Sequence, residues 1–196
     1  MVMNAMNATM MKELSDCFAT LKKEPAIQVL LIKGAGKAFS AGGDIKAMLN
    51  TEEAFDMEEM MRYLKVMVEA YYTLPMITVA AVQGAAAGLG FSLALGADII
   101  FADEESKLAM NFIGIGLVPD GGGHFFMTER LGAMKAKQLI WQGEIMEAKK
   151  AQELGLVDYL APKGDVLAMA DQMIGQLLAS PILSKIETKK MINAQK

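Results

Sequence analysis

The sequence predicts an α/β protein built around a parallel sheet. Short apolar runs alternate along the chain with longer segments in which apolar residues recur at helical spacing. One run, residues 77–83, is apolar almost throughout, which is typical of a strand covered on both faces. Strands that alternate with helices pair in parallel through right-handed crossovers. Because no linker or internal repeat interrupts the pattern, we expect a single domain over residues 1–196.

The chain begins with a predicted helix and strand. The helix covers residues 10–23, and either Asn7 or Thr9 can cap it. Pro25 separates this helix from an apolar strand at residues 27–33. The apolar face of the helix comprises Leu14, Cys17, Phe18 and Leu21.

A second helical region follows the first strand. Residues 44–49 read as the start of a helix, and residues 50–55 are polar and predict a loop. Residues 57–73 form a strongly amphipathic pattern that ends before Pro75. The apolar residues that recur at helical spacing in this segment are Met60, Leu64, Met67, Val68 and Tyr71.

The rest of the chain continues the alternation of strands and helices. Further strands are predicted at residues 77–83, 98–102, 107–109 and 156–160. Further helices are predicted at residues 89–96, 125–131, 134–141, 147–154, 166–179 and 181–191. Between them, residues 111–123 are rich in glycine and predict an irregular loop that lines a site or approaches a ligand closely.

The composition excludes several functional classes. With 53% hydrophobic and 21% charged residues, the chain is that of a globular protein. The net charge of −4 and the lack of a basic run argue against nucleic acid as a partner. No apolar run reaches the roughly 18–20 residues of a membrane span, so we expect no membrane partner. Cys17 is the only cysteine, so no internal disulfide can form, and we expect a reducing, cytoplasmic location and an inert, buried thiol.

Two glycine-bearing segments, residues 36–44 and 84–90, each follow a predicted strand. Each can present a bare backbone N–H at a strand-to-helix junction. Two such donors that converge on one point form an oxyanion hole, which stabilises the negative charge that develops on a carbonyl oxygen. The sequence therefore predicts an enzyme that acts on acyl groups.

In order and spacing, several segments together resemble the crotonase family, the enoyl-CoA hydratase/isomerase superfamily. Any one of these segments is a weak signal, but the ordered set is specific and extends over nearly the whole chain. The matching segments are Asn4-Ala5-Met6, residues 36–44, residues 84–98, residues 115–122 and residues 151–157.

The resemblance implies a spiral of ββα repeats over about residues 1–160, followed by the start of a helical region at residues 161–196. It implies acyl-CoA thioester substrates, with coenzyme A as part of the substrate and no separate cofactor, and a homotrimer or hexamer. It assigns the two oxyanion donors to the backbone N–H groups of Gly43 and Leu89. The residues that it places against the substrate or its coenzyme A are Ala41, Asp44, Ile45, Gly88, Phe112 and Leu117.

The chain departs from the family at the two positions where hydratases carry glutamates. Here these positions are Ser92 and Phe112. A phenylalanine cannot transfer a proton, and a serine cannot replace a carboxylate as a base without a partner. We therefore expect no efficient hydration.

One carboxylate remains near the expected site, that of Asp120 in the segment Val118-Pro119-Asp120-Gly121-Gly122. Some enoyl-CoA isomerases are similar here, with an aspartate that moves a proton between C2 and C4. Isomerisation requires one base, and an apolar wall would raise the pKa of the carboxyl toward a useful value. Alternatively, Asp120 is a turn residue before glycines. His124, the only histidine, could act as a base, but its place at a helix start is more typical of capping or packing.

Compared with the family, a first strand and the closing terminal helices are expected to be missing, so that the chain is truncated at both ends. Our leading hypothesis is an enoyl-CoA isomerase-like enzyme with Gly43, Leu89 and Asp120 as its catalytic groups. Hydration, thioester hydrolysis or dehalogenation through a nucleophilic Asp120, and a catalytically silent acyl-CoA-binding subunit remain alternatives. No cluster in the sequence has the spacing of metal ligands, so we expect no metal.

Overall fold

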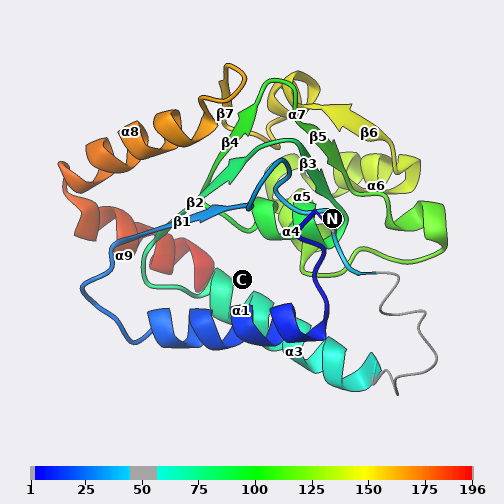
Figure 1. The fold of residues 1–196 in the computed structure, drawn as a ribbon. Coiled ribbons are helices and arrows are strands. Elements are labelled where there is room, and N and C mark those ends of the chain that lie inside the picture. Colours follow the sequence, from blue (N-terminus) through cyan, green and yellow to red (C-terminus); the bar gives the residue numbers. More distant parts are fainter. Residues whose placement is uncertain (1–2, 45–56, 196) are drawn as a thin grey trace.

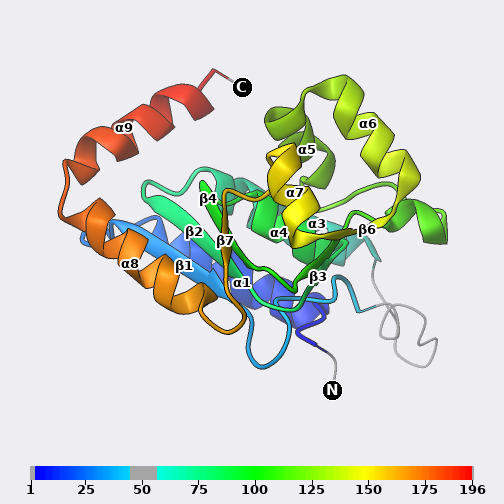
Figure 2. The ribbon, with the colours of Figure 1, turned by 90° about the horizontal axis from the view of Figure 1, so that it is seen from above.

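The computed structural model describes residues 3–44 and 57–195, and Figures 1 and 2 show their arrangement from two directions. Apart from Asp44, the predicted helix at residues 44–49 lies outside the described residues. The predicted loop at residues 50–55 also lies outside them.

The main sheet has four parallel strands in the order β1 (Val29–Lys33), β2 (Ile77–Val82), β4 (Ile99–Asp103) and β7 (Tyr159–Ala161). The parallel pairing that the alternating pattern predicted is confirmed for all three contacts in this sheet. The β2 strand lies between β1 and β4, with Val79 paired to Leu31 and to Ile99.

Both faces of β2 are covered, as its continuous apolar character predicted. Val79 and Ala81 face the helix α8 (Val166–Leu178) and pack with Val166 and Ala170. The alternate residues Ala80 and Val82 belong to the larger core on the opposite face. Figure 2 shows α8 lying along the sheet, with α9 (Ile182–Asn193) continuing from its end.

A second, smaller sheet joins β3 (Ala85–Ala87), β5 (Lys107–Ala109) and β6 (Ile145–Glu147). The β3 and β5 strands are parallel, whereas β5 and β6 are antiparallel. The sequence did not predict β3 or β6, because three residues are too short to show an alternating pattern. Two stretches of the chain share one order, a strand of the main sheet, a short strand of the second sheet and then a helix. In these stretches β2 and β3 precede the helix at residues 89–95, and β4 and β5 precede the helix at residues 123–131.

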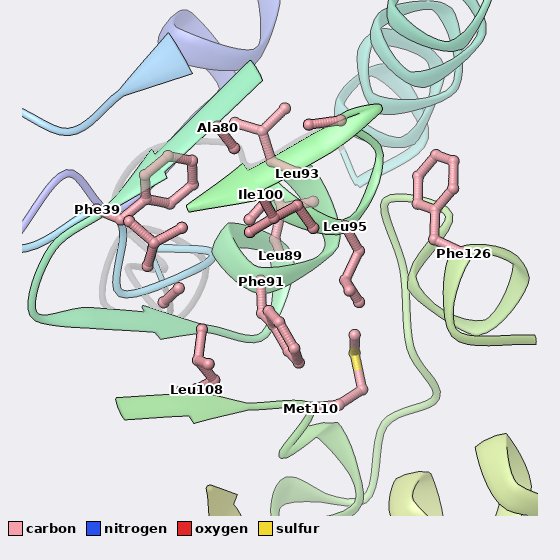
Figure 3. Close-up of a cluster of buried hydrophobic side chains, with 14 of the residues drawn as sticks. Phe39, Ala80, Leu89, Phe91, Leu93, Leu95, Ile100, Leu108, Met110 and Phe126 are labelled. Atoms are coloured by element: carbon pink, nitrogen blue, oxygen red, sulfur yellow. The ribbon is translucent and has the colours of Figure 1, made fainter. Parts of the chain in front are cut away.

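The helix α4 (Leu89–Leu95) occupies the centre of the molecule, and all seven of its residues are buried. Figure 3 shows its side chains Leu89, Phe91, Leu93 and Leu95 pointing into the surrounding core, which includes Leu108 and Met110. Because the helix is enclosed on every side, its position relative to both sheets is fixed by packing.

Two helices pack side by side at the edge of this core, α1 (Ala8–Leu21) and α3 (Met57–Tyr72) (Figure 1). The rings of Phe18 and Tyr71 stack between them, with centroids 4.9 Å apart. The expectation that Cys17 is buried is wrong, because Cys17 is exposed. The buried stripe of α1 runs through Met11, Ser15 and Phe18, which leaves Cys17 on the solvent side.

The remaining helices are close to their predicted bounds. They are α5 (Gly123–Leu131), α6 (Ala133–Gln142), α7 (Ala148–Leu154), α8 and α9 (Ile182–Asn193), and a short 3₁₀ turn, η1 (Phe112–Ile115), precedes them. The strand predicted at residues 156–160 begins later, at Tyr159. Within the described ranges, no single helix has the length and apolar content to cross a bilayer. The pair of α8 and α9 together has this length and apolar content, but the two helices are bent by 100° relative to each other.

Two substitutions at the start of α1 test which residue caps this helix. The Asn7 side chain accepts a hydrogen bond of 2.9 Å from Met10 N, whereas Thr9 lies inside the helix on its exposed side. Asn7→Ala is expected to lower the free energy of unfolding by about 1 kcal/mol. Thr9→Ala serves as the control and should change it little or raise it slightly, because alanine favours a helix interior. Chemical denaturation of both variants measures the difference, and equal effects would contradict Asn7 as the cap.

Candidate active site

A cavity of about 120 Å³ opens where the start of α4 meets the chain segment before residue 44. Among the described residues, five segments distant in sequence contribute to its walls: the helices α1 and α3, the strand-like segment at residues 41–43, the Gly88–Leu89 junction, and the loop from Asn111 to Asp120. The lining residues are Met11, Ala41, Gly42, Gly43, Met60, Gly88, Leu89, Asn111, Phe112, Ile115, Leu117 and Asp120.

The two glycine-bearing segments converge in this cavity. A Cβ placed on Gly42 would lie 2.6 Å from Ala87 O and 3.4 Å from Leu89 N, and one placed on Gly90 would lie 2.6 Å from Ser40 O. Gly42 also has a φ of +95°, which side-chain-bearing residues rarely adopt. The two backbones therefore approach more closely than any side chain would permit.

The N–H of Gly43 is directed away from the neighbouring strand. Gly43 forms a parallel bridge with Met6, in which Met6 N donates to Gly42 O at 2.7 Å and Asp44 N donates to Met6 O at 3.0 Å. Successive backbone groups of an extended strand alternate in direction. The N–H of Gly43 consequently points to the opposite side, and it has no acceptor among the described residues.

Leu89 is the first residue of α4, and its side chain is buried in the core (Figure 3). The first N–H groups of a helix lack intrahelical partners, and the first bond of α4 is that from Ser92 N to Gly88 O, at 2.9 Å. Gly88, before it, has a φ of +51° and no side chain that could cap the helix. The N–H of Leu89 is thus an unused donor at the cavity wall, within the part of the chain that the structure describes.

The two positions that correspond to the glutamates of hydratases hold no ionisable group. The Phe112 ring is buried against Gly88, where a Cβ would lie 3.5 Å from Phe112 Cζ. Ser92 is fully buried in α4 and does not line the cavity. Of the described residues that line the cavity, Asp120 is the one that carries a carboxylate.

The Asp120 side chain is partly buried, and its Oδ1 atom is inaccessible to solvent with no hydrogen-bond partner among the described residues. Burial raises the pKa of this carboxyl to about 6, although a hydrogen bond from its own backbone lowers it. A carboxylate with an unused oxygen and a pKa near neutrality is suited to accept and return a proton. Of the apolar wall expected around Asp120 (Phe112, Ile113, Leu117 and Val118), only Phe112 and Leu117 line the cavity. Ile113 and Val118 are exposed, so the expectation is wrong for these two residues.

The structure brings together seven of the nine residues that the sequence singled out: Gly43, Leu89, Asp120, Ala41, Gly88, Phe112 and Leu117. Asp44 is described but does not line the cavity, and its N–H is bonded to Met6 O. Ile45 lies outside the described residues. His124 is exposed on α5 and is not part of the cavity, so the structure gives no support to its action as a base.

Sequence reasoning did not select five residues of the cavity wall: Met11, Gly42, Met60, Asn111 and Ile115. Met11 and Met60 come from α1 and α3, and the only signal for them was the apolar face of each helix. Their flexible thioether side chains are suited to an adaptable apolar wall. Among the described residues, no three His, Cys, Asp or Glu side chains lie close enough to hold a metal ion.

Comparison with known proteins extends these observations. A family model described as enoyl-CoA hydratase/isomerase matches residues 1–196. The chain belongs to this family. The resemblance noted in the sequence is therefore confirmed, and the protein is an enzyme of the enoyl-CoA hydratase/isomerase family.

Individual relatives agree with this assignment. The chain is 45% identical over 186 residues to YhaR of Bacillus subtilis (strain 168), whose name places it among enoyl-CoA hydratases and isomerases. The match covers 95% of this chain and 72% of YhaR. It is 30% identical to the trans-2-decenoyl-[acyl-carrier-protein] isomerase of Streptococcus mutans, covering 97% of this chain and 74% of that protein.

The fold is shared with solved members of the enoyl-CoA hydratase/isomerase family. A crystal structure of an enoyl-CoA hydratase from Mycobacterium avium subsp. paratuberculosis superposes with a TM-score of 0.90 at 31% identity, and the match covers 99% of this chain and 77% of that one. The predicted crotonase-like fold is thus confirmed.

Proposed function

We propose that this enzyme catalyses an enoyl-CoA isomerase-type proton transfer. In this proposal the N–H groups of Gly43 and Leu89 bind the thioester oxygen, and the Asp120 carboxylate moves a proton between C2 and C4 of the acyl chain. The observation that carries the proposal concerns the described residues of one cavity, among which Asp120 supplies the one carboxylate, beside two backbone donors that have no acceptor there.

The chemistry requires only these groups. Removal of a proton from the carbon next to the thioester, or from its vinylogous position, places negative charge on the thioester oxygen. Two backbone donors stabilise that charge, and in related sites one such donor contributes roughly 3–4 kcal/mol to the transition state. The carboxylate that takes the proton can return it to the other carbon, so that no net change in protonation remains.

Hydration would need an acid and a base that act on a bound water molecule. At the positions where hydratases carry these groups, this chain has a buried serine and an aromatic ring packed on Gly88. The ring fills space beside the oxyanion donors with apolar surface. One of the relatives is named as an isomerase, of trans-2-decenoyl-[acyl-carrier-protein], and this name supports the proposal of isomerisation.

Three further properties remain proposals. The substrate is an acyl-CoA thioester that brings coenzyme A with it, and no separate cofactor takes part. The enzyme assembles as a homotrimer or hexamer, and it acts in the cytoplasm. Analytical ultracentrifugation of the purified protein tests the assembly.

The decisive experiment is a reaction with a 3-enoyl-CoA in D₂O. We expect deuterium at C2 and C4 and accumulation of the 2-enoyl isomer, without comparable formation of a 3-hydroxyacyl-CoA. Formation of the hydroxy product at a similar rate would establish hydration instead. A covalent acyl group on Asp120, detected by mass spectrometry, would establish the nucleophilic alternative, and no turnover of any acyl-CoA would favour the silent subunit.

The pKa of Asp120 predicts the pH dependence of the reaction. Because the base must be ionised, the rate of deuterium exchange is expected to rise with pH and to level off above about 6, the raised pKa of this carboxyl. A pH–rate profile from 4.5 to 8.5 would measure this midpoint. A rate that is independent of pH across this range would show that Asp120 does not act as the base.

A further inference from the structure

Ser92 makes a contact with the Asp120 loop that the proposed reaction does not itself explain. The Ser92 hydroxyl lies 2.9 Å from Asp120 O, to which it donates a hydrogen bond. Its other acceptors are more distant: Gly88 O at 3.3 Å and Met110 Sδ at 3.8 Å. Since a hydroxyl has one proton, the bond to Asp120 O is the favoured one.

The same loop rests directly on the face of α4 that carries Ser92. A Cβ placed on Gly121 would lie 2.3 Å from Leu89 Cδ1 and 3.2 Å from Ser92 Cβ. A Cβ placed on Gly123 would lie 2.4 Å from Ser92 Oγ. The loop and the helix can therefore meet only because residues 121 and 123 are glycines and residue 92 is small. A side chain as long as glutamate at position 92 would have to occupy the space of this loop.

Leu89 and Ser92 are three residues apart and share a face of α4. The backbone donor of Leu89 and the anchor for the Asp120 loop thus belong to a single helical turn that is buried on all sides. Asp120 O also accepts from Gly123 N at 2.9 Å, so the carbonyl is held from two directions.

We propose that Ser92 is a positioning residue. Its hydroxyl fixes the backbone of Asp120 against α4, which holds the carboxylate at a constant distance from the oxyanion donor of Leu89. This inference rests on the proposed function of Asp120 as the base. It also gives the serine at a hydratase glutamate position a role that involves no proton transfer with the substrate.

The test compares Ser92→Ala and Ser92→Cys with a matched control, Ser106→Ala. Ser106 is a fully buried serine whose hydroxyl donates to a backbone carbonyl, Val82 O, at 3.1 Å, and it does not line the cavity. The Cys variant replaces the hydroxyl by a slightly larger thiol, which is a weak hydrogen-bond donor. All three variants lose one buried hydrogen bond, so similar decreases in melting temperature are expected.

Only the two Ser92 variants should change catalysis. We expect kcat for Asp120-dependent exchange to fall about 10- to 100-fold, because a misplaced catalytic group costs this much, while KM changes less than threefold. The midpoint of the pH–rate profile and the carboxyl titration of Asp120 followed by ¹³C NMR should both move to lower pH, as the carboxyl becomes more exposed.

The outcomes separate this inference from the proposed function. If Asp120→Asn leaves turnover unchanged, the proposed function fails. If Asp120→Asn abolishes turnover but the Ser92 variants keep the kcat and pH midpoint of the Ser106→Ala control, only the positioning role is refuted. The ¹³C titration decides the positioning role even without an identified substrate, because an unchanged Asp120 pKa in both Ser92 variants would overturn it.

Discussion

Asp120→Asn is expected to reduce isomerisation and solvent exchange by about 10²- to 10⁴-fold, the usual contribution of a general base. Asparagine has nearly the same shape as aspartate but cannot accept the proton. Of the described residues that line the cavity, none carries a second carboxylate that could substitute for it. Exchange of deuterium into a 3-enoyl-CoA measures the loss, and binding of the acyl-CoA should persist because the backbone donors remain.

Protein stability provides the control for this variant. The folded-state pKa of Asp120 is raised from 3.8 to about 6, so the stability that its protonation contributes is present below about pH 4 and is lost as pH rises through 6. Above pH 6 the wild type must keep a partly buried carboxylate ionised, which lowers its stability, and Asp120→Asn removes this cost. The variant should therefore melt at a higher temperature than the wild type at pH 8, with little difference at pH 4. Asp171→Asn, at an exposed position on α8, should change neither activity nor melting temperature. Normal exchange in the Asp120 variant would refute its role as the base.

The sequence predicted those elements whose local pattern agrees with their final environment. Residues 77–83 are apolar on both faces, and β2 is indeed enclosed by α8 on one side and the main core on the other. The two glycine-bearing segments predicted a convergence of backbones, and the short distances around Gly42 and Gly90 agree with it. In these cases one physical cause explains why a residue type occurs at its position, so the local sequence pattern is sufficient to predict the structure there.

Elements that depend on distant partners could not be predicted in this way. The short strands β3 and β6 exist because other strands pair with them, and three residues carry no periodicity of their own. Cys17 was expected to be buried because it neighbours apolar residues, but the packing of α1 on α3 selects the stripe through Met11 and Phe18. The partner of Ser92 lies 28 residues further along the chain, and a serine in an apolar helix does not indicate which carbonyl it will bind.

Gly42→Ala should disable the oxyanion hole while leaving Asp120 in place. The new methyl group would lie 2.6 Å from Ala87 O and 3.4 Å from Leu89 N, so the segment that carries Gly43 must move away from α4. Loss of one oxyanion donor costs about 10²- to 10³-fold in kcat in related enzymes, and we expect a decrease of this order.

Gly36→Ala is the matched control, because Gly36 also has a positive φ, of +76°, but nothing lies within 4 Å of a Cβ at that position. Both variants force alanine into an unfavourable backbone conformation, which costs about 1–2 kcal/mol of stability. The close contact with Ala87 O adds a further loss of stability in Gly42→Ala. Only Gly42→Ala also separates the two donors, so a large loss of kcat is expected in that variant alone. If the two variants showed equal activities at a temperature where both are folded, the close approach at Gly42 would not serve to bind a thioester oxygen. The proposal that Gly43 and Leu89 act together would then be contradicted.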